Sequence, residues 1–182
     1  MSRKCVNSAD NFCYICGKVT LTNQRCSITQ RLETAYFHYF GIKIKNQDKS
    51  WVPHFSCTTC STNLIKWLNK KKRSLPFGVP MVWREPTNHA NDCYFCLTPP
   101  IQHGISRKKK RSVVYPDVAS VSRPVPHGIN LPVPRPPEEY QQDSEEAIHS
   151  MEVDYNEPTT SQSSQFIFFT LILIFSLLTA VM

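Results

Sequence analysis

The chain has 182 residues, enough for one domain of ordinary size or for a small domain with appendages. It holds 14 prolines and only five glycines, and it lacks the glycine clusters of phosphate-binding and dinucleotide-binding loops. Residues 1–137 carry all 21 Lys and Arg and six acidic residues, a net charge of +15, whereas residues 138–182 carry eight acidic residues and no basic ones. These features argue against an α/β enzyme and indicate a polyanion, most simply nucleic acid, as the partner of a basic body.

Three segments of regular structure are predicted along the first half of the chain. A helix begins at a Ser27 cap and ends at Gly41, with an apolar face of Ile28, Leu32, Ala35, Tyr36 and Tyr39. A second helix begins near Ser61, and its apolar face is Leu64, Ile65 and Leu68. Residues 77–83 form a strand, which Pro80 confines to the edge of a sheet.

The eight cysteines dominate the chemistry of the sequence. Six of them form three Cys-x-x-Cys pairs, and the N-terminus shows no apolar signal segment. Thiols that are not exported stay reduced, so paired thiols at this spacing are typical of metal ligands or redox pairs.

The first two pairs predict one metal site. Cys13 and Cys16 precede Gly17, which suits a left-handed turn, and Cys57 and Cys60 open a helix whose N-terminus stabilises thiolates. Ligation of zinc by these four cysteines is favoured over buried free thiols. It is also favoured over a thioredoxin-like pair, which lacks its βαβ context.

The third pair, Cys93 and Cys96, needs two more ligands. Candidates elsewhere in the chain are His89, His103, His127, Cys5 and Cys26. We favour His89, Cys93, Cys96 and His127, because His89 lies four residues before Cys93 and the prolines Pro124 and Pro126 just before His127 would fix its position. The alternative is that these histidines are solvated loop residues.

Two basic runs are candidate nucleic-acid contacts. They comprise Lys70, Lys71, Lys72 and Arg73, and Arg107, Lys108, Lys109, Lys110 and Arg111. Either run could contact phosphates or act as a nuclear-import signal. The simpler alternative is a solvated, solubilising surface.

The C-terminal part changes character twice. Prolines make residues 116–137 extended, and the acidic residues 138–165 lack the apolar content of a core, which predicts disorder. Residues 166–182 carry no charge and would span about 25 Å as a helix, at the short end for a membrane crossing. This segment is either a membrane anchor or an apolar tail from a truncated reading frame.

Residues 10–72 resemble the zinc-finger-associated domain of arthropod transcription factors. The likeness rests on the pair Cys13 and Cys16, on residues 53–60, and on Leu64 and Trp67. It implies a treble-clef module with four cysteine ligands that dimerises beside DNA-binding fingers. Residues 51–54, 80–86, 88–89, 92–96 and 123–127 also resemble a multi-copy, mobile-element-like family of invertebrate zinc-binding proteins.

The predicted fold is therefore a small α+β protein with four parts. Residues 1–85 form a treble-clef-like zinc domain, 86–130 a second zinc knuckle with a basic run, 131–165 a Pro-rich and then acidic disordered linker, and 166–182 a C-terminal hydrophobic helix. The sequence lacks the motifs of metalloproteases, serine hydrolases and P-loop enzymes. We expect a non-catalytic Zn²⁺-binding module that lies in the nucleus, associates with nucleic acid and dimerises. It should take no small-molecule substrate. The alternative is a tail-anchored membrane protein with a cytosolic zinc-binding scaffold.

Overall fold

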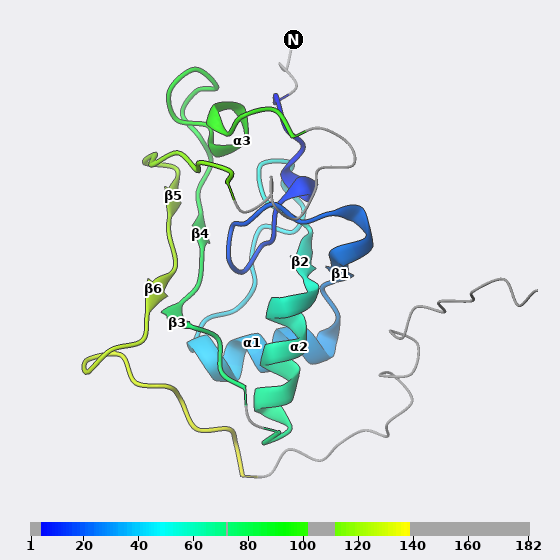
Figure 1. Ribbon diagram of the computed structural model, residues 1–182, viewed down its shortest axis with the longest axis vertical. Coiled ribbons are helices and arrows are strands. Elements are labelled where there is room, and N and C mark those ends of the chain that lie inside the picture. The colour runs from blue at the N-terminus through cyan, green and yellow to red at the C-terminus, as the bar shows by residue number, and fades with distance from the viewer. Residues whose placement is uncertain (1–4, 72, 102–111, 139–182) are drawn as a thin grey trace, which may run out of the picture. The chain divides into compact units, whose positions relative to one another are not determined.

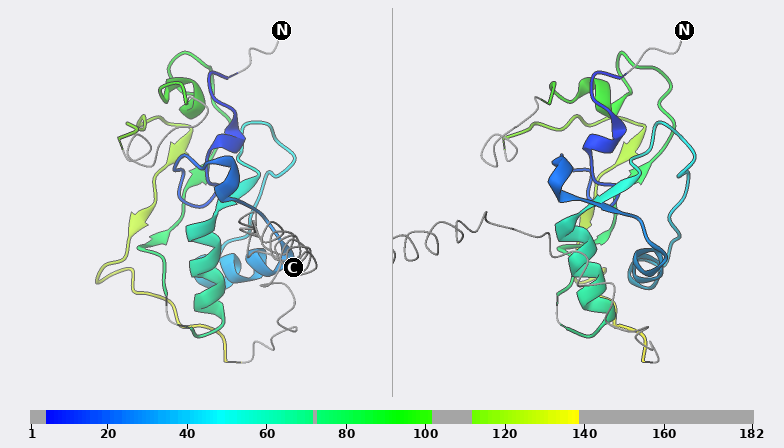
Figure 2. Two further views of the ribbon diagram at one scale, coloured as in Figure 1. Left: turned by 45° about the vertical axis from the view of Figure 1, so that its right-hand side comes forward. Right: turned by 90° about the vertical axis from the view of Figure 1, so that its right-hand side faces the viewer.

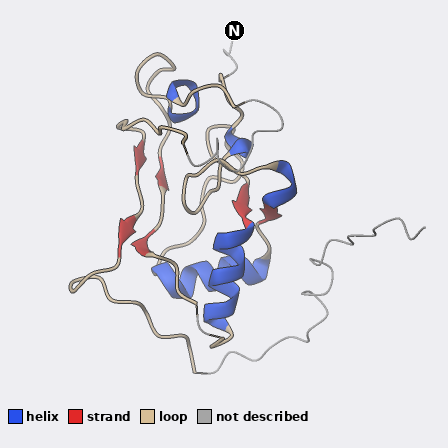
Figure 3. Cartoon of the chain, in the orientation of Figure 1, coloured by secondary structure: helices blue, strands red, loops and turns tan. Residues whose placement is uncertain are grey.

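The computed structural model describes residues 5–71, 73–101 and 112–138, which belong to one compact unit. Its helices are α1 (Gln30–Phe40), α2 (Thr58–Leu68) and α3 (Tyr94–Leu97), with the 3-10 turns η1 (Ala9–Asn11) and η2 (Thr22–Gln24). Its short strands are β1 (Arg25–Ser27), β2 (Phe55–Cys57), β3 (Phe77–Val79), β4 (Val82–Trp83), β5 (Val121–Ser122) and β6 (Val125–Pro126). Helices and small sheets joined by much irregular chain confirm the predicted α+β class (Figures 1 and 3).

Helix α1 starts later than the sequence predicted. Thr29, not Ser27, caps it, because the Thr29 hydroxyl accepts the Leu32 N–H at 3.3 Å while Ser27 is taken into β1. The helix ends at Gly41, which adopts a left-handed φ of 69°. Its buried face carries Leu32, Ala35, Tyr36 and Tyr39.

Helix α2 starts earlier than predicted, directly at the second cysteine pair. Cys57 is its N-cap and Cys60 lies in its first turn, with Leu64, Trp67 and Leu68 buried further along. Helices α1 and α2 pack against each other, and Figure 2 shows α1 end-on beside α2. The antiparallel pair β1–β2 leads into α2 and fixes where that helix begins.

The predicted strand over residues 77–83 is two strands interrupted at Pro80 and Met81. Strand β3 pairs with β6 and β4 pairs with β5, both antiparallel, so residues 77–83 run beside residues 121–126. This pairing spans the predicted boundary between residues 85 and 86. Part of the segment expected to be merely extended therefore belongs to the folded body.

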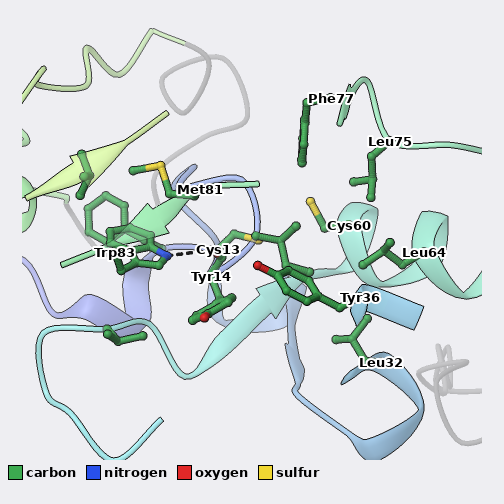
Figure 4. Packing of buried hydrophobic residues seen from close by; sticks show 14 of the residues in the cluster. Cys13, Tyr14, Leu32, Tyr36, Cys60, Leu64, Leu75, Phe77, Met81 and Trp83 are labelled. Carbon is green, nitrogen blue, oxygen red and sulfur yellow. Dashed lines mark hydrogen bonds between the residues drawn. The ribbon is translucent and has the colours of Figure 1, made fainter. Parts of the chain in front are cut away.

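Aromatic side chains hold the N-terminal residues against α3 and β4. Phe12 is fully buried and contacts the rings of Tyr94 and Phe95 at centroid distances of 5.6 and 5.1 Å. Trp83 donates its indole N–H to the Tyr14 carbonyl at 2.8 Å, the dashed line in Figure 4. The buried indole donor is thus satisfied within the core.

The Pro-rich chain after β6 lies against the two long helices. The His127 ring contacts the Tyr39 hydroxyl at 2.7 Å, and the Trp67 indole N–H donates to the Pro134 carbonyl at 2.9 Å. The predicted disorder of residues 139–165 and the predicted helix over 166–182 lie outside the described residues.

Candidate metal centres

The first cysteine pair lies on a tight turn. The Gly17 N–H donates to the Cys13 carbonyl at 2.8 Å, and the Cys13 N–H donates to the Lys18 carbonyl at 2.9 Å. Gly17 has a φ of 70°, and a Cβ at this position would lie 2.9 Å from Met81 Sδ. Both the backbone angle and the packing therefore favour glycine at this turn.

The second pair is brought to the first by the N-terminus of α2. The Cys57 N–H points at Cys13 Sγ, 3.1 Å away, and the Cys60 N–H lies 3.5 Å from Cys57 Sγ. The Sγ atoms of Cys16 and Cys57 are 4.0 Å apart, and all four sulfur atoms lie within 4.8 Å of one another. Sulfurs around one tetrahedral zinc ion are about 3.8 Å apart, so the donor set and spacing fit such an ion.

This four-cysteine cluster is partly buried, and its four thiols lie close together. Cys13 and Cys60 are 0% and 3% exposed, whereas Cys16 and Cys57 are half-buried. Burial raises the pKa of the Cys13 thiol well above its usual range, whereas hydrogen bonds from Cys13, Cys16 and Cys60 hold the pKa of Cys57 far below it. Without a cation the cluster can hold little negative charge; a divalent cation would favour the thiolate form of all four.

A second cluster joins the third cysteine pair to the N-terminal residues. It consists of Cys5, His89, Cys93 and Cys96, whose ligand atoms also lie within 4.8 Å of one another. His89 Nδ1 lies 3.5 Å from Cys5 Sγ and 3.4 Å from Cys96 Sγ, and the sulfurs of Cys5 and Cys93 are 3.7 Å apart. A tetrahedral zinc site requires about 3.5 Å between nitrogen and sulfur and about 3.8 Å between sulfurs.

The second cluster is nearer the surface than the first. Cys93 is buried, Cys5 and Cys96 are half-buried, and His89 is exposed. Burial raises the pKa of the Cys5 thiol to about 12, so metal binding here would displace a proton from Cys5.

Asp92 organises the loop that presents this cluster. Its carboxylate accepts the Thr87 N–H at 2.8 Å, the Thr87 hydroxyl at 3.0 Å and the Ser120 N–H at 2.8 Å. The Thr87 N–H is the main cause that lowers the pKa of Asp92. Asn88 Oδ1 accepts the N–H groups of Ala90 and Asn91, both at 2.9 Å. These hydrogen bonds, which involve none of the cluster's sulfur atoms, shape the loop from Thr87 to Asp92 and join it to Ser120.

The structure places Cys5, rather than His127, beside His89, Cys93 and Cys96. His127 is held elsewhere, since its Nδ1 lies 2.9 Å from the Leu131 carbonyl and its Nε2 contacts Tyr39. These two contacts place the His127 ring against α1, away from the second cluster. The sequence offered one hint toward Cys5. Six of the eight cysteines form Cys-x-x-Cys pairs, which leaves Cys5 and Cys26 as possible ligands for the third pair.

The remaining candidate ligands have other surroundings. Cys26 is buried, and its thiol lies 3.8 Å from the Thr58 hydroxyl. His54 Nδ1 lies 2.9 Å from an Asp10 carboxylate oxygen. His103 lies outside the described residues.

The first predicted basic run follows α2 directly. Lys70 has a left-handed φ of 56°, and its ammonium donates to the Glu138 carbonyl at 3.1 Å. Lys71 and Arg73 are exposed, whereas Lys72 and the whole run Arg107–Arg111 lie outside the described residues.

Comparisons with protein-family models, curated proteins and solved structures find no match for this chain. The two resemblances drawn from its sequence motifs therefore stay predictions. Within the described residues, no helix is both long and apolar enough to cross a bilayer. The candidate anchor over residues 166–182 lies outside them.

Proposed function

We propose that the chain is a zinc-binding, non-catalytic interaction module with two structural zinc centres. The single observation that carries this proposal is the convergence of two complete sets of four ligands, each within 4.8 Å. Thiolate with imidazole is a donor set that suits zinc, and thiolate-rich sites exclude magnesium and calcium. Four protein ligands leave no open position for a reacting water, which favours structural over catalytic zinc.

The first centre has the layout of a treble clef in this proposal. One pair lies on the turn at Cys13 and Cys16, and the other at the start of α2. The second centre is a Cys-Cys-Cys-His knuckle that ties Cys5 to the loop before α3.

Metal analysis of the reduced full-length chain tests this proposal. We expect two zinc ions per chain, and one after Cys57→Ser, because Cys57 is a ligand of the first centre only. Cys26→Ser is the matched control, because Cys26 belongs to neither cluster, and it should keep both ions. A native chain that binds no zinc under reducing conditions would remove the basis of the proposal.

Nucleic acid is the partner that the charge favours. The described residues hold 13 Lys and Arg against seven Asp and Glu, and among them one Lys or Arg pairs with a carboxylate, Lys49 with Asp48 at 2.9 Å. Cations that are not neutralised by the protein itself can contact phosphates and release counterions. In this proposal the run Arg107–Arg111 adds phosphate contacts and nuclear import, and dimerisation follows only from the domain resemblance.

The basic run is tested by replacing Lys108, Lys109 and Lys110 with alanine in the full chain. We expect weaker binding to nucleic acid, a shallower salt dependence and reduced nuclear entry, with unchanged zinc content. Replacing Lys43 and Lys45, which are exposed and outside both runs, is the matched control. If the native and triple-variant chains bind nucleic acid and enter the nucleus equally, the run only makes the surface more soluble.

A further inference from the structure

A cavity of about 310 Å³ opens beside the first metal centre. Cys16 and Lys18 from the cysteine turn line one part, and Met81 and Tyr94 line its apolar part. Pro76 and Phe77 beside Met81, and the chain from Tyr115 to Pro126, complete the lining. The cavity thus lies where four separate stretches of the chain meet.

The charges that line this cavity have one sign. Among the described residues that line it, the charged ones are Lys18 and Arg123, both basic and exposed, and none is a carboxylate. Arg123 Nη2 donates to the Tyr115 carbonyl at 2.5 Å, which holds the guanidinium in place and leaves it further N–H donors. By contrast, the cavity of about 290 Å³ beside α1 contains Glu33 as well as Lys43. The first cavity is therefore the one that suits an anion.

Aromatic and apolar groups form the interior of the cavity. The rings of Tyr94 and Tyr115 are parallel within 5° at a centroid distance of 6.1 Å. Met81 and Tyr94 are 2% and 4% exposed, so they form the bottom of the cavity, whereas Tyr115 is half-buried. A basic rim beside aromatic side chains is the combination by which proteins bind single-stranded nucleic acid, through phosphate contacts and base stacking.

A base within a duplex is paired and stacked and cannot enter a cavity, so the ligand must offer an unpaired base.

We propose that this cavity is a binding site for single-stranded nucleic acid. Lys18 and Arg123 hold a phosphate, and an unpaired base inserts between Met81 and Tyr115. This inference rests on the proposed nucleic-acid function and names its ligand class and its contact residues.

The test measures fluorescence anisotropy of a short fluorescein-labelled oligouridylate against a duplex RNA of equal length, using the full chain loaded with zinc. We expect the native protein to favour the single strand. Lys18→Ala with Arg123→Ala should weaken single-strand binding roughly tenfold. Two lost phosphate contacts should also reduce the salt slope by about 1.4. Lys43→Ala with Lys45→Ala is the matched control and should bind as the native chain does.

A second readout locates the base directly. Photocrosslinking with a 4-thiouridine oligonucleotide, followed by mass spectrometry, should label Tyr115 or Met81. Zinc content equal to that of the native chain shows that the double variant is folded.

The outcomes separate this inference from the broader function. If the Lys18 and Arg123 variant binds like the native chain while the Lys108–Lys110 variant does not, the cavity proposal is wrong and the nucleic-acid function stands. Preference for duplex, or crosslinks confined to the basic runs, also overturns the cavity proposal. A native chain that binds neither oligonucleotide overturns both.

Discussion

Cys5→Ser is the perturbation that separates the two possible ligand sets of the second centre. Serine is a poor zinc ligand, and Cys5 Sγ lies 3.7 Å from Cys93 Sγ and 3.5 Å from His89 Nδ1. The variant should therefore bind one zinc per chain, whereas His127→Ala should keep two, because His127 contacts Tyr39 and Leu131 instead.

Loss of the zinc ion from the second centre should also lower the melting temperature. Zinc at a thousandfold excess over its dissociation constant stabilises the folded state by about 4 kcal/mol. An unfolding entropy of about 2.1 cal/mol/K per residue gives roughly 0.26 kcal/mol/K for the 123 described residues, so the Tm of Cys5→Ser should fall by about 15 °C. Native mass spectrometry and circular dichroism melts measure the two effects. Two zinc ions in Cys5→Ser, or one in His127→Ala, would refute the assignment of Cys5.

Three further predictions address the turn, the core and alkaline pH. Gly17→Ala should destabilise the zinc-loaded fold by about 1–2 kcal/mol, and by more than Gly41→Ala, since both glycines have positive φ but only Gly17 has a close neighbour, Met81. Equal losses in denaturant titrations would contradict this. Leu64→Ala, which empties a fully buried position on α2, should cost about 2–5 kcal/mol in the same titrations; a loss below 1 kcal/mol would show that the site is not packed as described. Burial raises the pKa values of Tyr36 and Tyr94, so above about pH 10 the unfolded chain releases protons that the folded chain retains, and stability falls as pH rises. Tyrosinate absorbance should then appear together with loss of circular dichroism; ionisation of every tyrosine near pH 10 in a still-folded chain would refute the burial argument.

The sequence was most informative where the determinants are local. The two residues between Cys13 and Cys16, and between Cys57 and Cys60, place each pair on one turn, and Gly41 marks the end of α1 by its left-handed conformation. The α1 cap was misplaced by two residues because Ser27 and Thr29 are both good caps, and only the pairing of Ser27 with Phe55 in β1–β2 distinguishes them.

The features that the sequence did not predict depend on distant contacts. The neighbours of Cys5 lie 84 to 91 positions along the chain, and no local pattern marks such a pairing. The strands over residues 121–126 are short and interrupted by Pro124, so they lack the alternation that predicts a strand, and they form by pairing with residues 77–83, about 40 to 50 positions earlier in the chain. His127 was assigned to the metal because prolines precede it, whereas its contact with Tyr39 follows from the pairing of β6 with β3, which the sequence did not reveal.

The positions of the ligands along the chain set an order of assembly during synthesis. All four ligands of the first centre are available once Cys60 has left the ribosome. The second centre is complete only when Cys96 has also emerged, although its first ligand, Cys5, is synthesised before all the others. Because emerging domains fold from the N-terminus onward, the turn at Cys13 and Cys16 and the start of α2 can close around one ion before the second site exists. A ribosome paused between these two points would therefore present a half-metallated intermediate whose Cys5 thiol is still accessible to alkylating reagents.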